Sequence, residues 1–261
     1  MKELPILTAE NLSKIYGNKR AALTEALSQF NLTVNKGEFI SVMGPSGSGK
    51  TTLLNLLSTI DTPTSGKVTI NRRNVTSLSK NKLAKFRRNE LGFIFQDYNL
   101  LDTLTIGENI LLPLTLQKRK VKEMRKKLDH VTKQLGIESI VQKRIYEVSG
   151  GQKQRTAIAR AIIHNPTIIF ADEPTGNLDS KATLQVMESL EALNKKQHAT
   201  TIMVTHDPFA ASFSGRVIFI RDGKLFNEIH RGNNRQSFFE DILNVQSLLG
   251  GNMNDFQTIR F

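Results

Sequence analysis

A glycine-rich octapeptide at residues 44–51 constrains the fold of this chain more than any other feature. It reads GPSGSGKT and fits the pattern G-x-x-x-x-G-K-[ST]. The preceding residues 38–43 (EFISVM) are typical of a strand, and the apolar cluster at 53–57 has helical spacing. The pattern requires this order of strand, loop and helix. The sequence therefore predicts an α/β core with a phosphate-binding loop, which we call the phosphate loop.

The phosphate loop contains the residue types that hold a triphosphate and its Mg²⁺ ion. Small residues let consecutive N–H groups and the positive end of the following helix dipole point at one anion. Lys50 is expected to reach the β- and γ-phosphates, and the Thr51 hydroxyl to ligate Mg²⁺. An ordinary glycine-rich turn is the alternative, and the flanking patterns argue against it. We assign nucleotide binding to Gly44, Pro45, Ser46, Gly47, Ser48, Gly49, Lys50, Thr51 and Thr52.

Two further predicted strands end in polar residues that suit phosphate chemistry. Residues 167–171 (TIIFA) are typical of a strand buried in a parallel sheet, and Asp172 and Glu173 follow them. Residues 200–205 (TTIMVT) repeat the pattern, and His206 follows. The carboxyl ends of such strands open onto the ligand crevice. We expect Asp172 to ligate Mg²⁺, Glu173 to orient or deprotonate the attacking water, and His206 to sense the γ-phosphate. A solvated acidic pair and a structural histidine are the alternatives.

Residues 149–152 (SGGQ), which we call the SGGQ turn, precede a helical pattern that Pro166 stops. The S-x-x-Q spacing is that of a capping box, in which Ser149 and Gln152 satisfy the first N–H groups of the helix. Capping alone is one interpretation. However, Gly150 and Gly151 each weaken a helix by up to roughly 1 kcal/mol relative to alanine. A phosphate approaching the bare helix start would compensate for this loss. Two phosphate cradles but one nucleotide loop would indicate sites shared between two copies of the chain.

The chain is expected to form one main domain with a helical insertion, followed by a tail. Residues 97–165 have helical periodicity and many charged and glutamine residues, which predicts a smaller helical lobe within a domain at 1–225. The tail is 226–261. Six of its apolar residues fall roughly on one helical face: Phe238, Phe239, Ile242, Val245, Leu248 and Leu249. We expect this amphipathic helix to dock on its own domain.

Composition narrows the possible functions. The chain has no cysteine, which excludes disulfides, thiol nucleophiles and cysteine-based metal sites. No apolar stretch approaches the roughly 20 residues that cross a bilayer, so any transport route is expected in another chain. The net charge of +12 is compatible with nucleic acid, anionic lipid or solubility alone. A nucleic-acid partner is not expected, because the basic run at 118–133 has no interleaved aromatic residue and is typical of a solvated helix face.

Taken in order, the motifs of this chain resemble the ABC ATPase family. The elements that carry the resemblance are Tyr16, GPSGSGKT, Gln96, VSGGQKQR, IIFADEP, GNLDS and His206, within about residues 6–223. Seven ordered elements make the match specific. The resemblance implies an α/β P-loop NTPase fold with a RecA-like core, a small antiparallel β subdomain and a helical signature subdomain. It also implies ATP and Mg²⁺ as cofactors.

The resemblance assigns roles to several residues. In such proteins the aromatic at Tyr16 stacks on adenine. Gln96 contacts Mg²⁺ or water, as a metal-binding and catalytic residue, and relays to the membrane subunit. The SGGQ turn, through Ser149 and Gly151, clamps the γ-phosphate of ATP held by the opposite protomer, and Asp179 in GNLDS lies at the dimer seam. These roles imply a head-to-tail dimer with a second copy of the chain.

A closer resemblance is to the ATPases of bacitracin-resistance-type modules. Residues 92–114, the GNLDS motif and the tail NRQSFFEDILNVQSLLGG carry it. It implies an ATPase at the cytoplasmic face of the membrane that powers a separate integral membrane permease in sensing and removing antimicrobial peptides, with a sensor histidine kinase linked through the permease. ATPases for lipoprotein release, macrolide export and cell division are the alternatives. A signalling ATPase that gates a partner kinase without transport is another.

Overall fold

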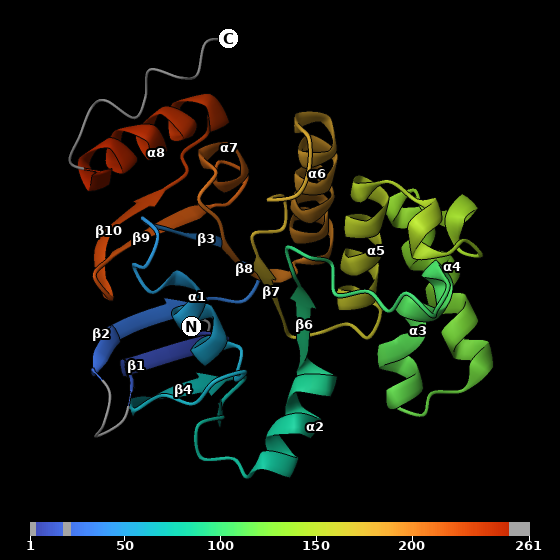
Figure 1. Ribbon diagram of the computed structural model, residues 1–261, viewed down its shortest axis with the longest axis horizontal. Coiled ribbons are helices and arrows are strands. Elements are labelled where there is room, and N and C mark those ends of the chain that lie inside the picture. Colours follow the sequence, from blue (N-terminus) through green and yellow to red (C-terminus); the bar gives the residue numbers. More distant parts are fainter. Residues whose placement is uncertain (1–3, 18–21, 251–261) are drawn as a thin grey trace.

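The phosphate loop follows a strand inside a six-stranded sheet (Figure 1). The computed structural model describes residues 4–17 and 22–250. The strand order is β10-β9-β3-β8-β7-β6, in which β10 pairs antiparallel with β9 and all other neighbours pair in parallel. The strands are β3 (Phe39–Met43), β6 (Leu91–Ile94), β7 (Ile168–Asp172), β8 (Thr200–Val204), β9 (Arg216–Arg221) and β10 (Lys224–His230). The predicted parallel core is therefore confirmed.

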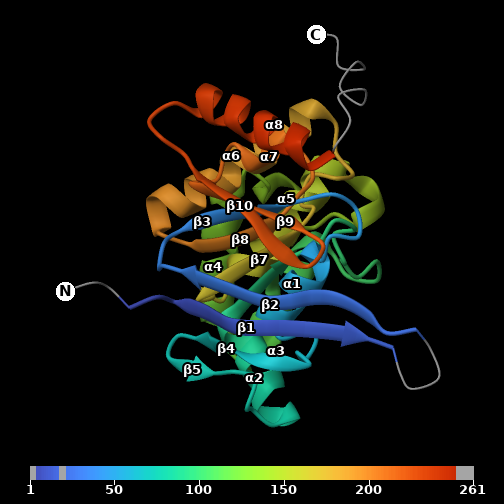
Figure 2. The ribbon, with the colours of Figure 1, turned by 90° about the vertical axis from the view of Figure 1, so that its left-hand side faces the viewer.

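A smaller antiparallel sheet packs beside the main one (Figure 2). Its order is β2-β1-β4-β5, with β1 at Leu7–Tyr16, β2 at Thr24–Val34, β4 at Ser65–Ile70 and β5 at Arg73–Asn74. Helix α1 (Lys50–Leu57) packs against both sheets. Leu27 of β2, Val42 of β3 and Leu53 of α1 share one buried cluster. Because apolar residues of three elements meet there, α1 is held against both sheets.

Helices cover the opposite side of the main sheet. They are α3 (Ile106–Leu116), α4 (Val121–Leu135), α5 (Gly150–Ile162) and α6 (Ser180–Gln197). Ile110, Ile158 and Leu190 join Ile169 and Met203 of the sheet in a second buried cluster. Helices α3 to α5 fall within residues 97–165, where the helical lobe is predicted. Short 3₁₀ turns at Glu138–Ile140 and Ile145–Glu147 connect α4 to α5.

Helix α2 (Lys80–Glu90) precedes the outermost strand β6, and α7 (Pro208–Ala211) follows β8. Helix α2 is anchored by Phe86, the one residue of this helix that is buried. In Figure 1 it lies at the lower end of the molecule, beside the lower end of α3. This placement brings it next to the helical lobe, although a strand and a loop separate the two in the chain.

The tail forms helix α8 (Arg235–Gly250), which docks on its own domain as expected. Phe238 and Ile242 pack with Met43, at the end of β3, and with Ala211 of α7. The predicted face is too wide, however, because Leu248 is 68% exposed. At 100° per residue, Leu248 lies about 80° away from Phe238 around the helix axis, outside the stripe that meets the sheet. Residues 251–261 of the predicted tail lie outside the described residues.

Candidate active site

Backbone geometry shapes the phosphate loop before any ligand binds. Gly47 and Gly49 have φ of 75° and 102°, in the left-handed region that favours glycine. A Cβ atom at Gly49 would collide with the carbonyl oxygen of Ala26. Gly49 is also the N-cap of α1, and no side chain caps this helix start. The first N–H groups of α1 are therefore available to an anion at the mouth of the loop.

Lys50 is held within the phosphate loop. Its Nζ donates to the carbonyl oxygens of Gly44 at 2.9 Å and Pro45 at 2.8 Å. Burial lowers the pKa of Lys50, while the nearby carboxylates of Glu173 and Asp172 oppose that shift. Among the described residues, no carboxylate lies within ion-pair distance of this ammonium group. Lys50 is thus a partly desolvated cation that contacts only neutral carbonyls, which suits it to bind phosphate.

Asp172 ends β7 and lies on the Lys50 side of the sheet edge. Burial raises the pKa of Asp172, the adjacent Glu173 raises it further, and Lys50 opposes the shift. Because the charges of these three groups shift one another's pKa values, the strand-end acids and the phosphate loop face a common region. Asp172 is therefore suited to bind a cation. A divalent ion would offset both the cost of burying the charged carboxylate and its repulsion from Glu173.

Glu173 has a backbone that few glutamates adopt. Its φ is 44°, and its N–H donates to the carbonyl oxygen of Val204 at 2.9 Å, which holds the turn against the end of β8. Such left-handed positions cost about 1–3 kcal/mol for residues other than glycine, and they cluster at functional sites. The side chain is thereby aimed at the next strand end rather than along its own strand.

His206, at the end of β8, meets Glu173 directly. The His206 Nδ1 and Glu173 Oε1 atoms lie 3.0 Å apart, and the His206 N–H lies 3.4 Å from Oε2. The glutamate side chain is 17% exposed and the histidine 71%. Asp207 then caps α7 by accepting from the Phe209 N–H at 2.8 Å, which fixes the chain just after the histidine. The sequence placed both residues at one sheet edge, but it did not predict that they contact each other.

Gln96 faces the loop that follows Glu173 rather than the phosphate loop. Its Nε2 lies 3.4 Å from Asn177 Oδ1, and Asn177 Nδ2 donates to the Gln96 carbonyl at 3.2 Å and to Asp97 Oδ1 at 3.0 Å. Gly176 packs against the Gln96 side chain so closely that a Cβ atom there would lie 2.9 Å from Nε2. Gln96 thus couples β6 to the GNLDS loop.

The SGGQ turn is a complete capping box. Ser149 N–H donates to Gln152 Oε1 at 3.0 Å, and Gln152 N–H donates to Ser149 Oγ at 3.4 Å. Packing within the chain also accounts for the two glycines, since a Cβ atom would lie 3.2 Å from the Tyr98 hydroxyl at Gly150 and 3.1 Å from Ala182 Cβ at Gly151. In the described part of the chain, no hydrogen bond joins this turn to the phosphate loop.

Two predicted site residues already have partners of their own. Tyr16 donates its hydroxyl to Asp61 Oδ2 at 2.9 Å, and Lys14 Nζ lies 4.9 Å from the ring centre. Asp179 is the N-cap of α6, where its Oδ1 accepts from the Ala182 N–H at 2.8 Å. Either residue could still meet a nucleotide or a second chain, because both are exposed. The geometry assigns Asp179 a capping role that the motif alone did not indicate.

Comparison with known proteins identifies the assembly of these elements. The family model described as "ABC transporter" matches residues 27–176, more than half of the chain. The chain belongs to the ABC transporter family. The matched region begins in β2 and ends in the loop after Glu173, so it contains the phosphate loop, the SGGQ turn and both strand-end acids. The predicted family and its fold are confirmed.

Relatives of this ABC ATPase match it over nearly its whole length. The ABC transporter ATP-binding protein YxdL of Bacillus subtilis is 59% identical over 98% of both chains. The bacitracin export ATP-binding protein BceA of Halalkalibacterium halodurans is 53% identical over 97% of this chain and all of its own. The ATP-binding cassette MJ0796 of Methanocaldococcus jannaschii, solved as a dimer bound to ADP and Pi after hydrolysis, is 40% identical, with a TM-score of 0.79 over 87% of this chain and 99% of its own.

Sequence reasoning missed a clamp on the segment after Gln96. Arg160 of α5 donates to the carbonyl oxygens of Tyr98, at 2.7 Å, and Asn99, and both of these residues have positive φ, 61° and 47°. Burial lowers the pKa of Arg160. An arginine within the apolar helix pattern AIARAI was the available signal, because a buried guanidinium requires acceptors. In this ABC ATPase the clamp ties the helical lobe to the end of β6.

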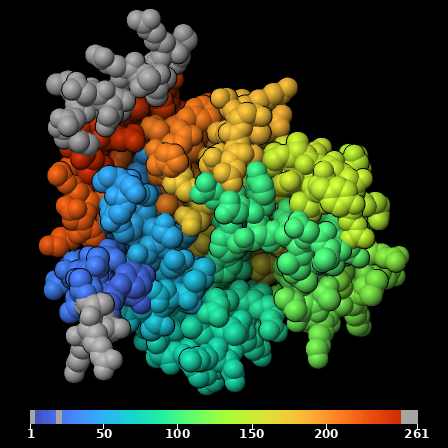
Figure 3. Space-filling view, in the orientation of Figure 1, coloured from blue at the N-terminus to red at the C-terminus, as the bar shows by residue number. Residues whose placement is uncertain are grey.

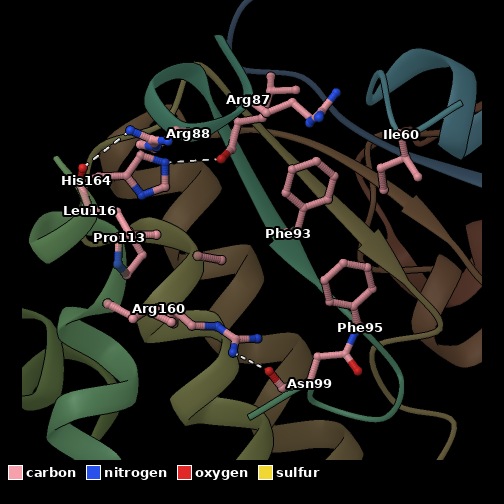
Figure 4. Close-up of a pocket in the computed structure, with 13 residues that line it drawn as sticks. Ile60, Arg87, Arg88, Phe93, Phe95, Asn99, Pro113, Leu116, Arg160 and His164 are labelled. Carbon is pink, nitrogen blue, oxygen red and sulfur yellow. Dashed lines mark hydrogen bonds between the residues drawn. The ribbon is translucent and has the colours of Figure 1, made fainter. Parts of the chain in front are cut away.

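An apolar groove lies between the main sheet and the helical lobe (Figure 4). Its volume is about 440 Å³, and stacked rings of Phe93 and Phe95, with centres 5.9 Å apart, form part of its wall. Arg88 and His164 lie at one end and Arg160 at the other. Burial lowers the pKa of His164, an effect that Lys127 reinforces and the Leu91 carbonyl and Glu90 oppose.

Neither a metal cluster nor a membrane span is found in the part of the chain that the structure describes. No three or more His, Cys, Asp or Glu side chains come together as ligands at any described position. No described helix is both long and apolar enough to cross a bilayer. A Mg²⁺ ion would therefore need oxygen ligands beyond the protein carboxylates, and phosphate oxygens are the usual source.

Proposed function

We propose that this ABC ATPase hydrolyses ATP at the carboxyl edge of its main sheet and thereby drives a separate integral membrane permease that protects the cell from bacitracin-like peptides. One observation carries the hydrolytic assignment. Glu173 meets His206 at 3.0 Å, on the same sheet edge as Lys50 and the uncapped start of α1. A base, its positioning partner and a phosphate cradle are thus present together.

The phosphate loop supports the triphosphate in this proposal. The N–H groups at the start of α1 bind phosphate oxygens, and Lys50 exchanges its two carbonyl partners for the β- and γ-phosphates. Tyr16 offers its exposed ring to adenine while Asp61 holds its hydroxyl. Each of these side chains needs only a local change in its contacts, so the site is largely formed before the nucleotide arrives.

Mg²⁺ fits the residues present, and when bound it would neutralise charge on the phosphates. The Thr51 hydroxyl, the Asp172 carboxylate and the Gln96 amide are the proposed protein ligands. The raised pKa of Asp172 supports this role, because the crowding that causes it is relieved by a nearby cation. Gln96 is held mainly by weak contacts to Asn177, at 3.4 Å, so its side chain is free to turn towards the ion.

Glu173 is proposed to orient and deprotonate the attacking water. The His206 ring fixes Oε1 of Glu173, and Oε2, which accepts only a long hydrogen bond of 3.4 Å from the His206 N–H, keeps a lone pair for water. His206, being mostly exposed, is proposed to contact the γ-phosphate and so to report that ATP is bound. The left-handed backbone at Glu173 supports this assignment, since it aims the carboxylate across the strand ends.

The SGGQ turn is proposed to complete the site of a second copy in a head-to-tail dimer. The dimeric form of MJ0796, with ADP and Pi, supports this arrangement. Ser149, Gly150, Gly151 and Gln152 form an exposed or half-exposed helix start, apart from the buried Gly151, and no contact ties the turn to its own phosphate loop. Asp179, which caps α6, is proposed to lie at the same seam.

The apolar groove beside Phe93 and Phe95 is the proposed docking site for the permease. The groove borders the segment after Gln96, and Arg160 ties this segment to the helical lobe. Hydrolysis of the nucleotide can therefore move a permease bound in the groove. We therefore propose that the ATPase lies at the cytoplasmic face of the membrane. The relationship to BceA supports a peptide of the bacitracin class as the compound handled, and a sensor histidine kinase as a further partner through the permease.

The decisive experiment is Glu173→Gln in the purified homodimer and in complex with its permease. Turnover of ATP is expected to fall about 100- to 10,000-fold, since a general base contributes that much, while ATP binding persists. Phosphate release and equilibrium binding of a fluorescent ATP analogue measure the two effects. A matched control is Glu188→Gln, which removes an exposed glutamate on α6 and should leave both unchanged.

Unchanged turnover in Glu173→Gln would refute the catalytic assignment. The peptide assignment is tested separately in cells that carry the chain with its permease. Bacitracin resistance should be lost in Glu173→Gln and kept in Glu188→Gln. Loss of ATP turnover without loss of resistance would refute the peptide assignment while leaving the ATPase intact.

A further inference from the structure

Most of the net positive charge of this protein comes from two short segments. Residues 80–90 contain five cationic side chains and one anionic, a net of +4. Residues 117–127 contain seven cationic and one anionic, a net of +6. Together they hold +10 of the +12 carried by the whole chain, so the remaining residues are close to neutral. Charge of one sign gathered in one region can attract a partner of opposite charge.

The two segments meet in space although about thirty residues separate them in the chain. Gln117 Nε2 donates to the Arg88 carbonyl at 3.1 Å, and Arg88 Nη1 lies 3.4 Å from the Leu116 carbonyl. Between the end of α2 and the turn from α3 to α4 is an open hollow of about 1040 Å³. Figure 3 shows the two segments, in teal and green, along the lower side of the molecule. We call this region the basic hollow.

Few acids neutralise the basic hollow. Its cationic lining residues are Lys85, Arg88, Lys118, Arg119 and Lys120. Of the two glutamates there, Glu123 lies 3.9 Å from both Arg119 and Lys127, and Glu90 accepts from the Thr167 hydroxyl. Within the described ranges no carboxylate pairs with Lys85, Lys118 or Lys120, and all three are exposed. The hollow therefore keeps its charge available to an anionic partner.

We propose that the basic hollow binds the anionic headgroups of a lipid bilayer. This proposal rests on the proposed docking of the permease in the apolar groove, because the groove and the hollow are continuous. Arg88, Leu116 and His164 line both of them. The face that meets the permease is then the face that carries the charge. Clusters of four to eight lysines and arginines beside a membrane attract its anionic lipids.

The chemistry of the hollow favours lipid over the other anionic partners. Three of its five cations are lysines, while Arg88 contacts the Leu116 carbonyl and Arg119 lies beside Glu123. Among its described lining residues there is no Phe, Tyr or Trp to stack on bases, so a nucleic acid has little to bind beyond the charge. An acidic protein segment would be expected to use the planar, bidentate fork of arginine. Flexible lysines suit a layer of mobile headgroups instead.

The test is flotation of the full-length protein, without its permease, on vesicles. Phosphatidylglycerol-rich vesicles should bind it at low salt, and pure phosphatidylcholine vesicles should not. The variant Lys85→Gln/Lys118→Gln/Lys120→Gln should bind the anionic vesicles on the order of 100-fold more weakly, from roughly fivefold per lysine. The control Lys36→Gln/Lys196→Gln/Lys224→Gln removes three exposed lysines elsewhere and leaves the same net charge, three below +12. It should keep most of the binding.

Equal losses in the two variants would overturn the proposal, because binding would then follow total charge rather than the hollow. So would equal binding to both kinds of vesicle. A hollow variant that keeps its vesicle binding but no longer co-purifies with the permease would also overturn it, and would assign the charge to an acidic protein segment. None of these lysines is placed in the catalytic machinery, so ATP turnover should be unchanged in every variant. The lipid proposal is therefore tested by vesicle binding and the role of Glu173 by ATP turnover, so either can fail without the other.

Discussion

The phosphate loop and the SGGQ turn both begin a helix, but they prepare it for a ligand in different ways. The phosphate loop leaves the start of α1 without a cap and places Gly49 in the left-handed region. The SGGQ turn satisfies its own helix start with a capping box, and its glycines have no positive φ. The first turn leaves N–H groups available to an anion, whereas the second already satisfies its own N–H groups and is proposed to act on the nucleotide of a partner.

The difference shows that similar glycine content can arise for different physical reasons. At Gly49, both the positive φ and the Ala26 carbonyl exclude a side chain. At Gly150 and Gly151 the backbone is helical, and it is the neighbouring Tyr98 and Ala182 that leave little room. Glycine therefore permits a backbone conformation in one turn and a close approach in the other.

Between these two turns, the largest expected effect separates the partner role of the SGGQ turn from its capping role. Ser149→Ala should lower ATP turnover on the order of 100-fold, as loss of one donor to a transition-state oxyanion does. It should also destabilise the fold by about 1 kcal/mol through loss of the cap. Thr105→Ala is the matched control, because Thr105 and Glu108 form the same capping box on α3. ATP turnover and the urea midpoint would be measured for both variants. If the two variants have equal turnover, Ser149 has only a capping role.

A smaller effect is expected for the backbone of the phosphate loop. Gly49→Ala should destabilise the protein by about 1–3 kcal/mol and weaken ATP binding, since the new Cβ atom meets the Ala26 carbonyl at an unfavourable φ. The control is Gly136→Ala, also at positive φ (61°) but with nothing within 4 Å of the added atom. Urea midpoints would show whether the collision adds to the cost of φ. If both variants are destabilised by the same free energy of unfolding, the contact with the Ala26 carbonyl contributes nothing at Gly49.

The smallest expected effect concerns pH. Because burial and Glu173 raise the pKa of Asp172, the folded state holds a proton there at higher pH than the unfolded state does. The corresponding stability is present below the unfolded pKa and lost as pH rises through the folded one. Asp172→Asn should therefore raise the urea midpoint of the nucleotide-free protein slightly at neutral pH and not in acid. Asp129→Asn, at an exposed site on α4, is the control. A midpoint that falls at neutral pH would contradict the assignment.

Several features of the fold and the site could be predicted because they depend on short stretches of sequence. The strands that lead to the phosphate loop, to Glu173 and to His206 are five residues each and buried almost throughout, so their apolar runs were unambiguous. The width of the tail face was overestimated, because helical periodicity does not report which neighbours are available to cover it.

Long-range contacts were beyond such reasoning. No local pattern indicated that His206 would contact Glu173, that Arg160 would hold the carbonyls of Tyr98 and Asn99, or that Asn177 would join Gln96. Each pair is separated by more than thirty residues, and each depends on strand register or on the packing of the helical lobe. The same holds for the basic hollow, whose two segments are separately ordinary solvated helix surfaces.

By itself the sequence determined the α/β core, the conformation of the phosphate loop, the capping box at Ser149 and the strand ends that carry Asp172, Glu173 and His206. Propensity, capping and hydrophobic period act over a few residues, so these features could be read directly. Only the tertiary structure decided which strand ends touch, which side chain clamps which turn, and where the positive charge gathers. Those outcomes depend on packing between distant elements, which no short window of residues encodes.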